Sequence, residues 1–146
     1  MTMDKEGILA LMSDDVKQYA DAELEVYNAP FARDLGIEIT FLGRDHVKLY
    51  LDIVPKHINS RGFVHGAVIY GLIDHSLAFA ANMAEEAVGQ SSNIIYHRPL
   101  QEGRLEVETV LVNRSRSLSV YDSKAYSNGK LIASATLTAF RLGERK

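Results

Sequence analysis

Residues 66–88 constrain the fold of this chain more than any other segment, because they are hydrophobic on nearly every side of a helical wheel. The segment begins at Gly66 and ends at Val88, and Gly89 follows as a candidate C-terminal cap. A helix with this pattern buries its whole surface rather than a single stripe. A membrane span is disfavoured because Asp74 and Asn82 would be costly in lipid. We therefore expect one long helix enclosed by the rest of the protein.

Alternating apolar and polar residues predict strands on both sides of this helix. Residues 36–42 and 47–53 have the two-residue period of a hairpin. After the helix, the same period predicts four strands in a meander, over residues 92–98, 105–113, 118–126 and 130–142. The pair Asn128-Gly129 between the last two is typical of a tight hairpin turn.

Residues 1–35 differ from the rest of the chain, and we expect them to form a helical arm of the same domain. Apolar residues recur at three- and four-residue spacing over residues 4–35, with Pro30 as an interruption. Residues 36–146 would then form one α+β domain. About six antiparallel strands can cover every face of a single apolar helix only if the sheet curls around it.

Composition excludes several classes of function. The chain has no cysteine, so disulfides, thiolate nucleophiles and cysteine-based zinc sites are unavailable. Its formal net charge is −3 and its basic residues are scattered, so we expect no nucleic-acid partner. The acidic groups among the first six residues do not fit a signal peptide, which favours a cytoplasmic location. The five histidines lack a convincing metal-ligand spacing, so we expect neither a metal nor a cofactor.

Two residues of the central helix are candidates for acyl-transfer chemistry. Gly66 lies at the predicted N-terminus, where unpaired N–H groups and the helix dipole can hold an oxyanion, although an ordinary helix start would have the same sequence. Asp74 lies eight residues further, among apolar neighbours that would bury its carboxylate. A structural aspartate bonded to Ser76 is the alternative.

The spacing of these two residues predicts a dimer. Eight helical residues correspond to about 12 Å, too far for Gly66 and Asp74 to reach the same thioester group. Two copies of the helix packed antiparallel across a two-fold axis would bring Gly66 of one chain beside Asp74 of the other. We therefore expect a homodimer, or a dimer of dimers, with two shared sites.

From Pro30 to the last predicted strand, and most specifically from Asn59 to Asp74, the chain resembles the phenylacetate-degradation type thioesterases of the hotdog superfamily, which hydrolyse aryl- and acyl-CoA thioesters. The matching pattern is an asparagine, then His65-Gly66 six residues later, then an acidic residue nine positions past the histidine. The resemblance implies a hotdog fold and an acyl-CoA substrate. It also implies that Asn59 and the Gly66 N–H bind the thioester carbonyl, while Asp74 of the partner chain acts as general base or as nucleophile.

The resemblance extends less firmly to other positions. Ser92 matches a hydroxyl that positions the attacking water, although its neighbour Ser91 competes for the inward face. We expect His65 to orient the loop through its ring N–H rather than to act as a base. Ala67 and His75 depart from the family pattern, and His75 either alters the acyl site or is a buried, hydrogen-bonded histidine.

Arg98, Arg114 and Arg116 flank strand ends and are candidate ligands for the phosphates of CoA, with solvated surface arginines as the alternative. Tyr96 and Pro99 could line the pantetheine channel. Two other functions share the fold: a hydratase or dehydratase, which would use His65 with Asp74, and a non-catalytic acyl-CoA-binding protein. The spacing of the motif favours the thioesterase, and leaves open both the acyl group and the choice between CoA and an acyl carrier protein.

Overall fold

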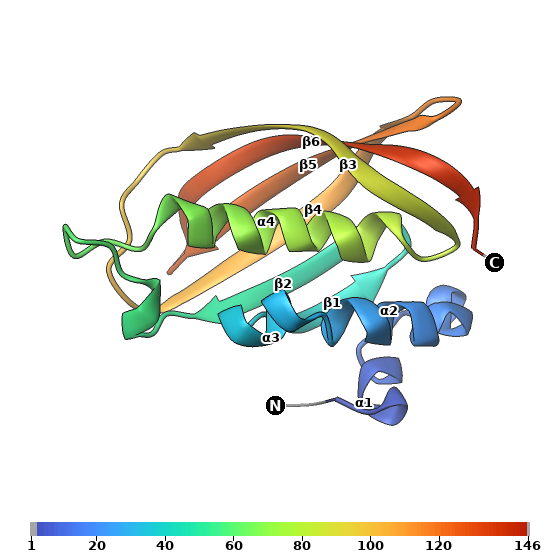
Figure 1. Cartoon of the computed structure of the whole chain (residues 1–146), viewed down its shortest axis with the longest axis horizontal. Coiled ribbons are helices and arrows are strands. Elements are labelled where there is room, and N and C mark those ends of the chain that lie inside the picture. The colour runs from blue at the N-terminus through green and yellow to red at the C-terminus, as the bar shows by residue number, and fades with distance from the viewer. Residues whose placement is uncertain (1–2, 146) are drawn as a thin grey trace.

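The computed structural model describes residues 3–145, and its alternating segments pair into one antiparallel sheet of six strands. The strand order across the sheet is β1-β2-β4-β5-β6-β3. The sheet curls around a central helix, α4, so that the protein has the α+β architecture expected from the sequence (Figure 1). The strands are β1 (Glu38–Gly43), β2 (His46–Asp52), β3 (Glu85–Tyr96), β4 (Arg104–Arg114), β5 (Leu118–Ser127) and β6 (Lys130–Glu144).

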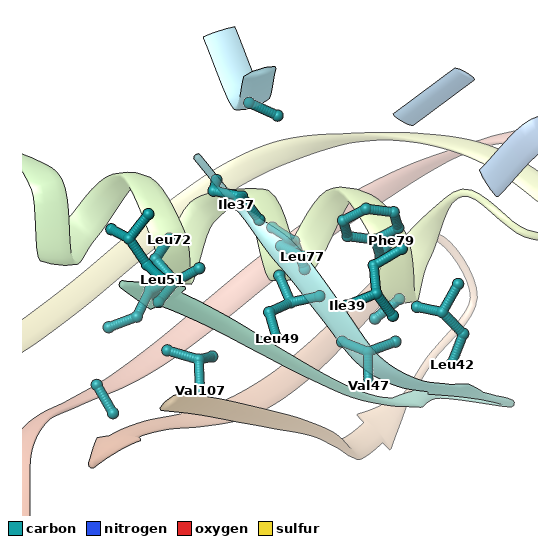
Figure 2. Packing of buried hydrophobic residues seen from close by; sticks show 14 of the residues in the cluster. Ile37, Ile39, Leu42, Val47, Leu49, Leu51, Leu72, Leu77, Phe79 and Val107 are labelled. Atoms are coloured by element: carbon teal, nitrogen blue, oxygen red, sulfur yellow. The ribbon is translucent and has the colours of Figure 1, made fainter. Parts of the chain in front are cut away.

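Helix α4 (Gly66–Ala81) lies against the concave face of the sheet and forms the centre of the hydrophobic core. Leu72, Ile73 and Phe79 of this helix are completely buried. Figure 2 shows Leu72, Leu77 and Phe79 directed toward the apolar residues of β1, β2 and β4. Each buried side chain of this size contributes roughly 1.5–3 kcal/mol to folding by leaving water. No helix within residues 3–145 has both the length and the apolar character required to cross a membrane.

Four short helices form the N-terminal arm, and the last two of them, residues 20–27 and 30–35, lie beside α4 (Figure 1). Tyr27 anchors them: it is buried, and its hydroxyl donates a hydrogen bond to Oε1 of Glu38 at 2.6 Å. Apolar side chains of the arm, such as Leu24 and Ala32, also pack into the hydrophobic core. The helices are α1 (Lys5–Leu9), the 3-10 helix η1 (Asp14–Tyr19), α2 (Ala20–Tyr27) and α3 (Pro30–Leu35).

The predicted end of the central helix at Val88 is wrong, because α4 ends at Ala81 and Gly89 lies within β3. Asn82 turns the chain. Its side-chain nitrogen donates to the carbonyl of Ala78 at 3.1 Å, and its side-chain oxygen accepts from the N–H of Ala87 at 2.9 Å. One asparagine thus closes the last turn of the helix and also positions the start of the next strand.

The predicted meander of four strands is also wrong, since only β4, β5 and β6 pair in succession. Strand β3 pairs with β6 at the far edge of the sheet, and β4 pairs with β2. The hairpin predicted at Asn128-Gly129 is confirmed: both residues have positive φ, 54° and 76°, as a tight turn between β5 and β6 requires.

Candidate active site

Gly66 begins α4 at a point where the backbone approaches Tyr96 closely. The hydroxyl of Tyr96 donates to the carbonyl of Gly66 at 3.1 Å. A Cβ atom at position 66 would lie 3.2 Å from the tyrosine ring, so glycine avoids a tight contact there. His65, which precedes the helix, provides no side-chain cap. The first N–H groups of α4 are therefore available to an anionic or carbonyl ligand.

Asn59 lies in the loop before α4, where hydrogen bonds within residues 3–145 use its side-chain oxygen but not its side-chain nitrogen. Its side-chain oxygen accepts from the N–H of Arg61 at 2.9 Å and from the N–H of Phe63 at 3.1 Å. Both bonds use the oxygen, and so the NH₂ group remains the available donor. Asn59 and the N-terminus of α4 thus offer hydrogen-bond donors of the kind that an oxyanion needs.

The same loop is fixed by His57, a residue that sequence reasoning missed. His57 is buried; its Nδ1 accepts from the N–H of Val54 at 3.0 Å, and its Nε2 donates to the carbonyl of Leu35 at 2.8 Å. The N–H of His65 in turn donates to the carbonyl of His57 at 2.9 Å. Within residues 3–145 the ring of His65 forms no hydrogen bond, so the backbone of His65, and not its ring, ties the loop together in a single subunit.

Asp74 is exposed in the single subunit, contrary to the expectation that its apolar neighbours would bury it. The neighbours point inward to the core, whereas Asp74 projects from the stripe of α4 that faces β3. It lines a pocket of about 110 Å³ whose walls are mostly small or aliphatic side chains. The other lining residues are Leu77, Ala78, Ala81, Asn82, Ala87, Val88, Gly89 and Ala139.

Ser92 lies beside Tyr70, which is one helical turn before Asp74. The hydroxyl of Tyr70 donates to the Oγ of Ser92 at 2.9 Å. Gly89, and not Ser92, shares the pocket of Asp74 within one subunit. Sequence reasoning missed Tyr70, because its partner lies on another element and the motif gives no sign of that contact.

A second pocket, of about 300 Å³, opens at the Gly66 end of α4. Burial raises the pKa of Tyr96 in its wall, and the neighbouring Tyr70 adds to the effect, so Tyr96 stays a neutral donor. Arg98 also lines this pocket, and it donates to the carbonyl of Leu131 at 3.0 Å. The remaining lining residues are Phe63, Val64, Gly66, Ile69, His97, Pro99 and Leu100.

The other two candidate arginines lie elsewhere. Arg114 lines a different pocket with Ala80 and Ala81, at the C-terminal end of α4, and pairs there with Asp45 at 3.2 Å and Glu85 at 3.5 Å. Arg116 is exposed on the connection between β4 and β5. A single subunit therefore places only Arg98 beside Gly66.

His75 faces the N-terminal arm rather than the stripe that carries Asp74. Its Nε2 donates to the carbonyl of Val26 at 2.8 Å, and its ring packs edge-on against Phe79 with 5.2 Å between ring centroids. Desolvation lowers the pKa of His75 and keeps it neutral near pH 7. Of the two possibilities left by the sequence, the structure selects the hydrogen-bonded histidine.

Known proteins share both this fold and part of the sequence. A variant of the phenylacetic acid degradation protein PaaI from Thermus thermophilus is 36% identical, with a TM-score of 0.76 over 78% of this chain and 100% of its own. A Streptococcus mutans UA159 protein, crystallised with acetyl CoA, is 28% identical, with a TM-score of 0.71 over 76% of this chain and 92% of its own. The PaaI protein of E. coli is 24% identical and matches the fold with a TM-score of 0.83, over 90% of this chain and 96% of its own.

The sequence profile of the thioesterase superfamily matches residues 61–133, which run from the loop before α4 into β6. The matched region contains Gly66, Asp74 and Ser92, and the curled sheet around a single long helix is the hotdog architecture of the structural relatives. This chain therefore belongs to the thioesterase superfamily and has the hotdog fold.

Proposed function

We propose that this protein hydrolyses acyl-CoA thioesters to a free acid and CoA, with Asp74 as the catalytic carboxylate in a site shared by two subunits. The observation that carries the proposal is the placement of Gly66 and of the exposed Asp74 two turns apart on the side of α4 next to the edge strand β3. The uncapped helix end can bind an oxyanion, and the exposed carboxylate can accept a proton. The S. mutans relative, crystallised with acetyl CoA, supports an acyl-CoA substrate.

Strand β3 supports the proposed assembly. It is an edge strand of 12 residues, and β6 is its only strand partner within residues 3–145. It exposes Val88, Ile95 and Tyr96, each about half accessible, on an edge that has backbone groups to pair. Pairing β3 with β3 of a second copy would satisfy these groups and cover the apolar side chains.

The contacts between α4 and β3 support one register for this proposed pairing. If Gly66 of one chain faces Asp74 of the other, the two-fold axis passes position 70 of α4. Because Tyr70 contacts Ser92, the axis should also pass Ser92 in β3. A bulge between Gly89 and Ser91 shortens one side of β3, so Val88 and Ile95 lie at equal ladder distances from Ser92 and would face each other across the interface. Two exposed apolar side chains would thus become cross-strand partners.

In such a dimer, the pocket at Gly66 of one chain would join the pocket at Asp74 of the other. The thioester carbonyl would accept hydrogen bonds from the Gly66 N–H and the Asn59 amide nitrogen. Asp74 of the partner subunit would take a proton from water as the water oxygen bonds to the carbonyl carbon; the carbon–sulfur bond then breaks, and the thiolate of CoA regains the proton. The reaction needs only water, a carboxylate and these donors, and we propose that it uses no metal or cofactor.

The two pockets suggest different roles. We assign the larger one, with Tyr96, Pro99 and Arg98, to the pantetheine arm and a phosphate of CoA. The smaller one, floored by alanine and glycine, would hold the acyl group. Arg114 is a weaker candidate for CoA, because Asp45 and Glu85 already neutralise it, and Arg116 could contribute only through its exposed position.

The proposal is tested by following thiol release from a panel of short-chain, medium-chain and aryl-CoA thioesters. We expect turnover by the wild type, and a loss of several orders of magnitude in kcat for Asp74→Asn with little change in the unfolding midpoint. Asp34→Asn, on the exposed side of the arm, is the matched control and should keep full activity. Wild-type rates in Asp74→Asn would sink the assignment.

A further inference from the structure

Tyr70 lies on α4 midway between Gly66 and Asp74, four residues from each. It lies with them on the side of the helix next to β3, about 6 Å along the axis from either position. Its phenol therefore lies within one turn of both groups to which we assign the chemistry.

The hydroxyl of Tyr70 has a single partner on a different element. It donates to the Oγ of Ser92 at 2.9 Å, and Ser92 forms no other side-chain hydrogen bond within residues 3–145. A serine that accepts from a phenol keeps its own O–H for another acceptor. Rotation of the Ser92 hydroxyl is also restricted, because one of its lone pairs must face Tyr70. The pair thus restricts the hydroxyl proton of Ser92 to directions away from Tyr70 at the exposed surface of β3.

The proposed dimer indicates a role for the Ser92 hydroxyl. The two-fold axis that brings Gly66 to the partner's Asp74 passes position 70, so the Tyr70 and Ser92 pairs of both chains would lie between the two sites. No residue of the motif itself occupies this position.

We propose, resting on the function proposed above, that Tyr70 is a positioning residue that aims the Ser92 O–H at the water attacking the thioester. Ser92 donates a hydrogen bond to the water oxygen without transferring its proton. Asp74 accepts the proton of that water, and the remaining lone pair of the oxygen forms the bond to the carbonyl carbon. Tyr70 touches neither water nor substrate and acts only through Ser92.

This role predicts a specific kinetic signature. Tyr70→Phe retains the aromatic ring and removes only the oxygen that bonds Ser92. We expect kcat to fall about 3- to 10-fold, as for the loss of one hydrogen bond that acts on the transition state, while KM changes less than about twofold. A change in packing or assembly would instead alter KM, the unfolding midpoint or the dimer.

A double-mutant cycle of Tyr70→Phe and Ser92→Ala tests the proposal on the purified full-length protein. Since Tyr70 acts through Ser92, the double variant should be no slower than Ser92→Ala alone. Tyr126→Phe is the matched control, because the Tyr126 hydroxyl on β5 forms no hydrogen bond in the described part of the chain; it should keep wild-type kcat.

The outcomes separate this proposal from the function on which it rests. Turnover by the wild type combined with an unchanged kcat in Tyr70→Phe, or with losses that multiply in the double variant, overturns the role of Tyr70 alone. A Tyr70→Phe protein that no longer elutes as the wild-type oligomer also overturns it, in favour of a structural role. Absence of turnover by the wild type on every thioester overturns both.

Discussion

At the scale of single residues, Glu23 of α2 is the least expected feature of the structure. It is completely buried, and neither carboxylate oxygen has a hydrogen-bond partner within residues 3–145. Desolvation raises its pKa well above the usual value, and the opposing field of Arg145 does not cancel the rise. Glu23 is therefore expected to carry a proton in the folded protein at pH values where it ionises in the unfolded chain.

A raised folded-state pKa fixes the sign of a pH effect. Protonated Glu23 is compatible with burial at acidic pH, and stability is lost as the pH rises above about 4.5, where the unfolded chain releases the proton. Glu23→Gln removes this titration while keeping the shape of the side chain. We expect the variant to exceed the wild type in free energy of unfolding by about 1–3 kcal/mol at pH 8, and by less at pH 5.

Urea denaturation at several pH values measures this difference. Glu25→Gln, on an exposed position of the same helix, is the matched control and should shift little. A Glu23→Gln protein whose advantage over the wild type shrinks as the pH rises would contradict the buried, protonated carboxyl group.

At the scale of elements, the exposed edge of β3 is the surface through which we propose that two subunits meet. Ile95→Lys places a charge on the edge that we propose pairs with a second copy, where the charge would lie against the apolar side chains of that copy and lose its hydration. We expect this variant to elute as a monomer in size-exclusion chromatography with light scattering, and to lose thioesterase activity together with the dimer. Val112→Lys, at an exposed valine on β4 away from the proposed interface, is the control that should stay assembled and active. A dimeric, active Ile95→Lys protein would exclude this edge as the interface.

The same elements show what could be predicted from the sequence. The Asn128-Gly129 turn and the first hairpin were predictable because their signals are local. The end of α4 was not, since alanine, valine and glutamate around residues 84–88 are compatible with either element, and the turn depends on the side chain of Asn82. The position of β3 was not either, because pairing with β6 joins segments far apart in the chain.

The residues of the candidate site also differ in whether the sequence indicates them. Asn59, Gly66 and Asp74 could be recognised from their spacing, which reflects a loop followed by a helix. The partners of Tyr70 and His57 lie on other elements, and neither residue belongs to a spacing pattern. Local order in the sequence indicates candidate residues for the chemistry, but gives no sign of the groups that hold those residues in place.

At the scale of the whole molecule, the proposed sharing of each site between two chains predicts that two inactive chains can restore each other. Gly66→Pro removes the N–H that would bind the oxyanion, and Asp74→Asn removes the carboxylate. Each variant should be nearly inactive by itself. In a mixed dimer one site receives both defects and the other receives neither, so random exchange should restore roughly a quarter of the wild-type sites.

The measurement is the thiol-release rate after the two variants are unfolded together and refolded, compared with the variants refolded apart. Gly66→Pro must first be seen to fold and assemble by circular dichroism and light scattering. Mixed dimers that form but remain inactive would mean that both residues serve one chain, and the proposed pairing of α4 with its symmetry copy would have to be given up.

The exposure of Asp74 in the single subunit has a further consequence, in terms of mass action. If the second half of each site comes from another chain, a freely diffusing monomer has no complete catalyst, and the fraction of working protein follows the dissociation constant of the dimer. A thioester bound across both chains would favour association by the same linkage. The concentration of the protein, and not only that of its substrate, would then set the rate per chain, so a cell could silence this activity by dilution alone.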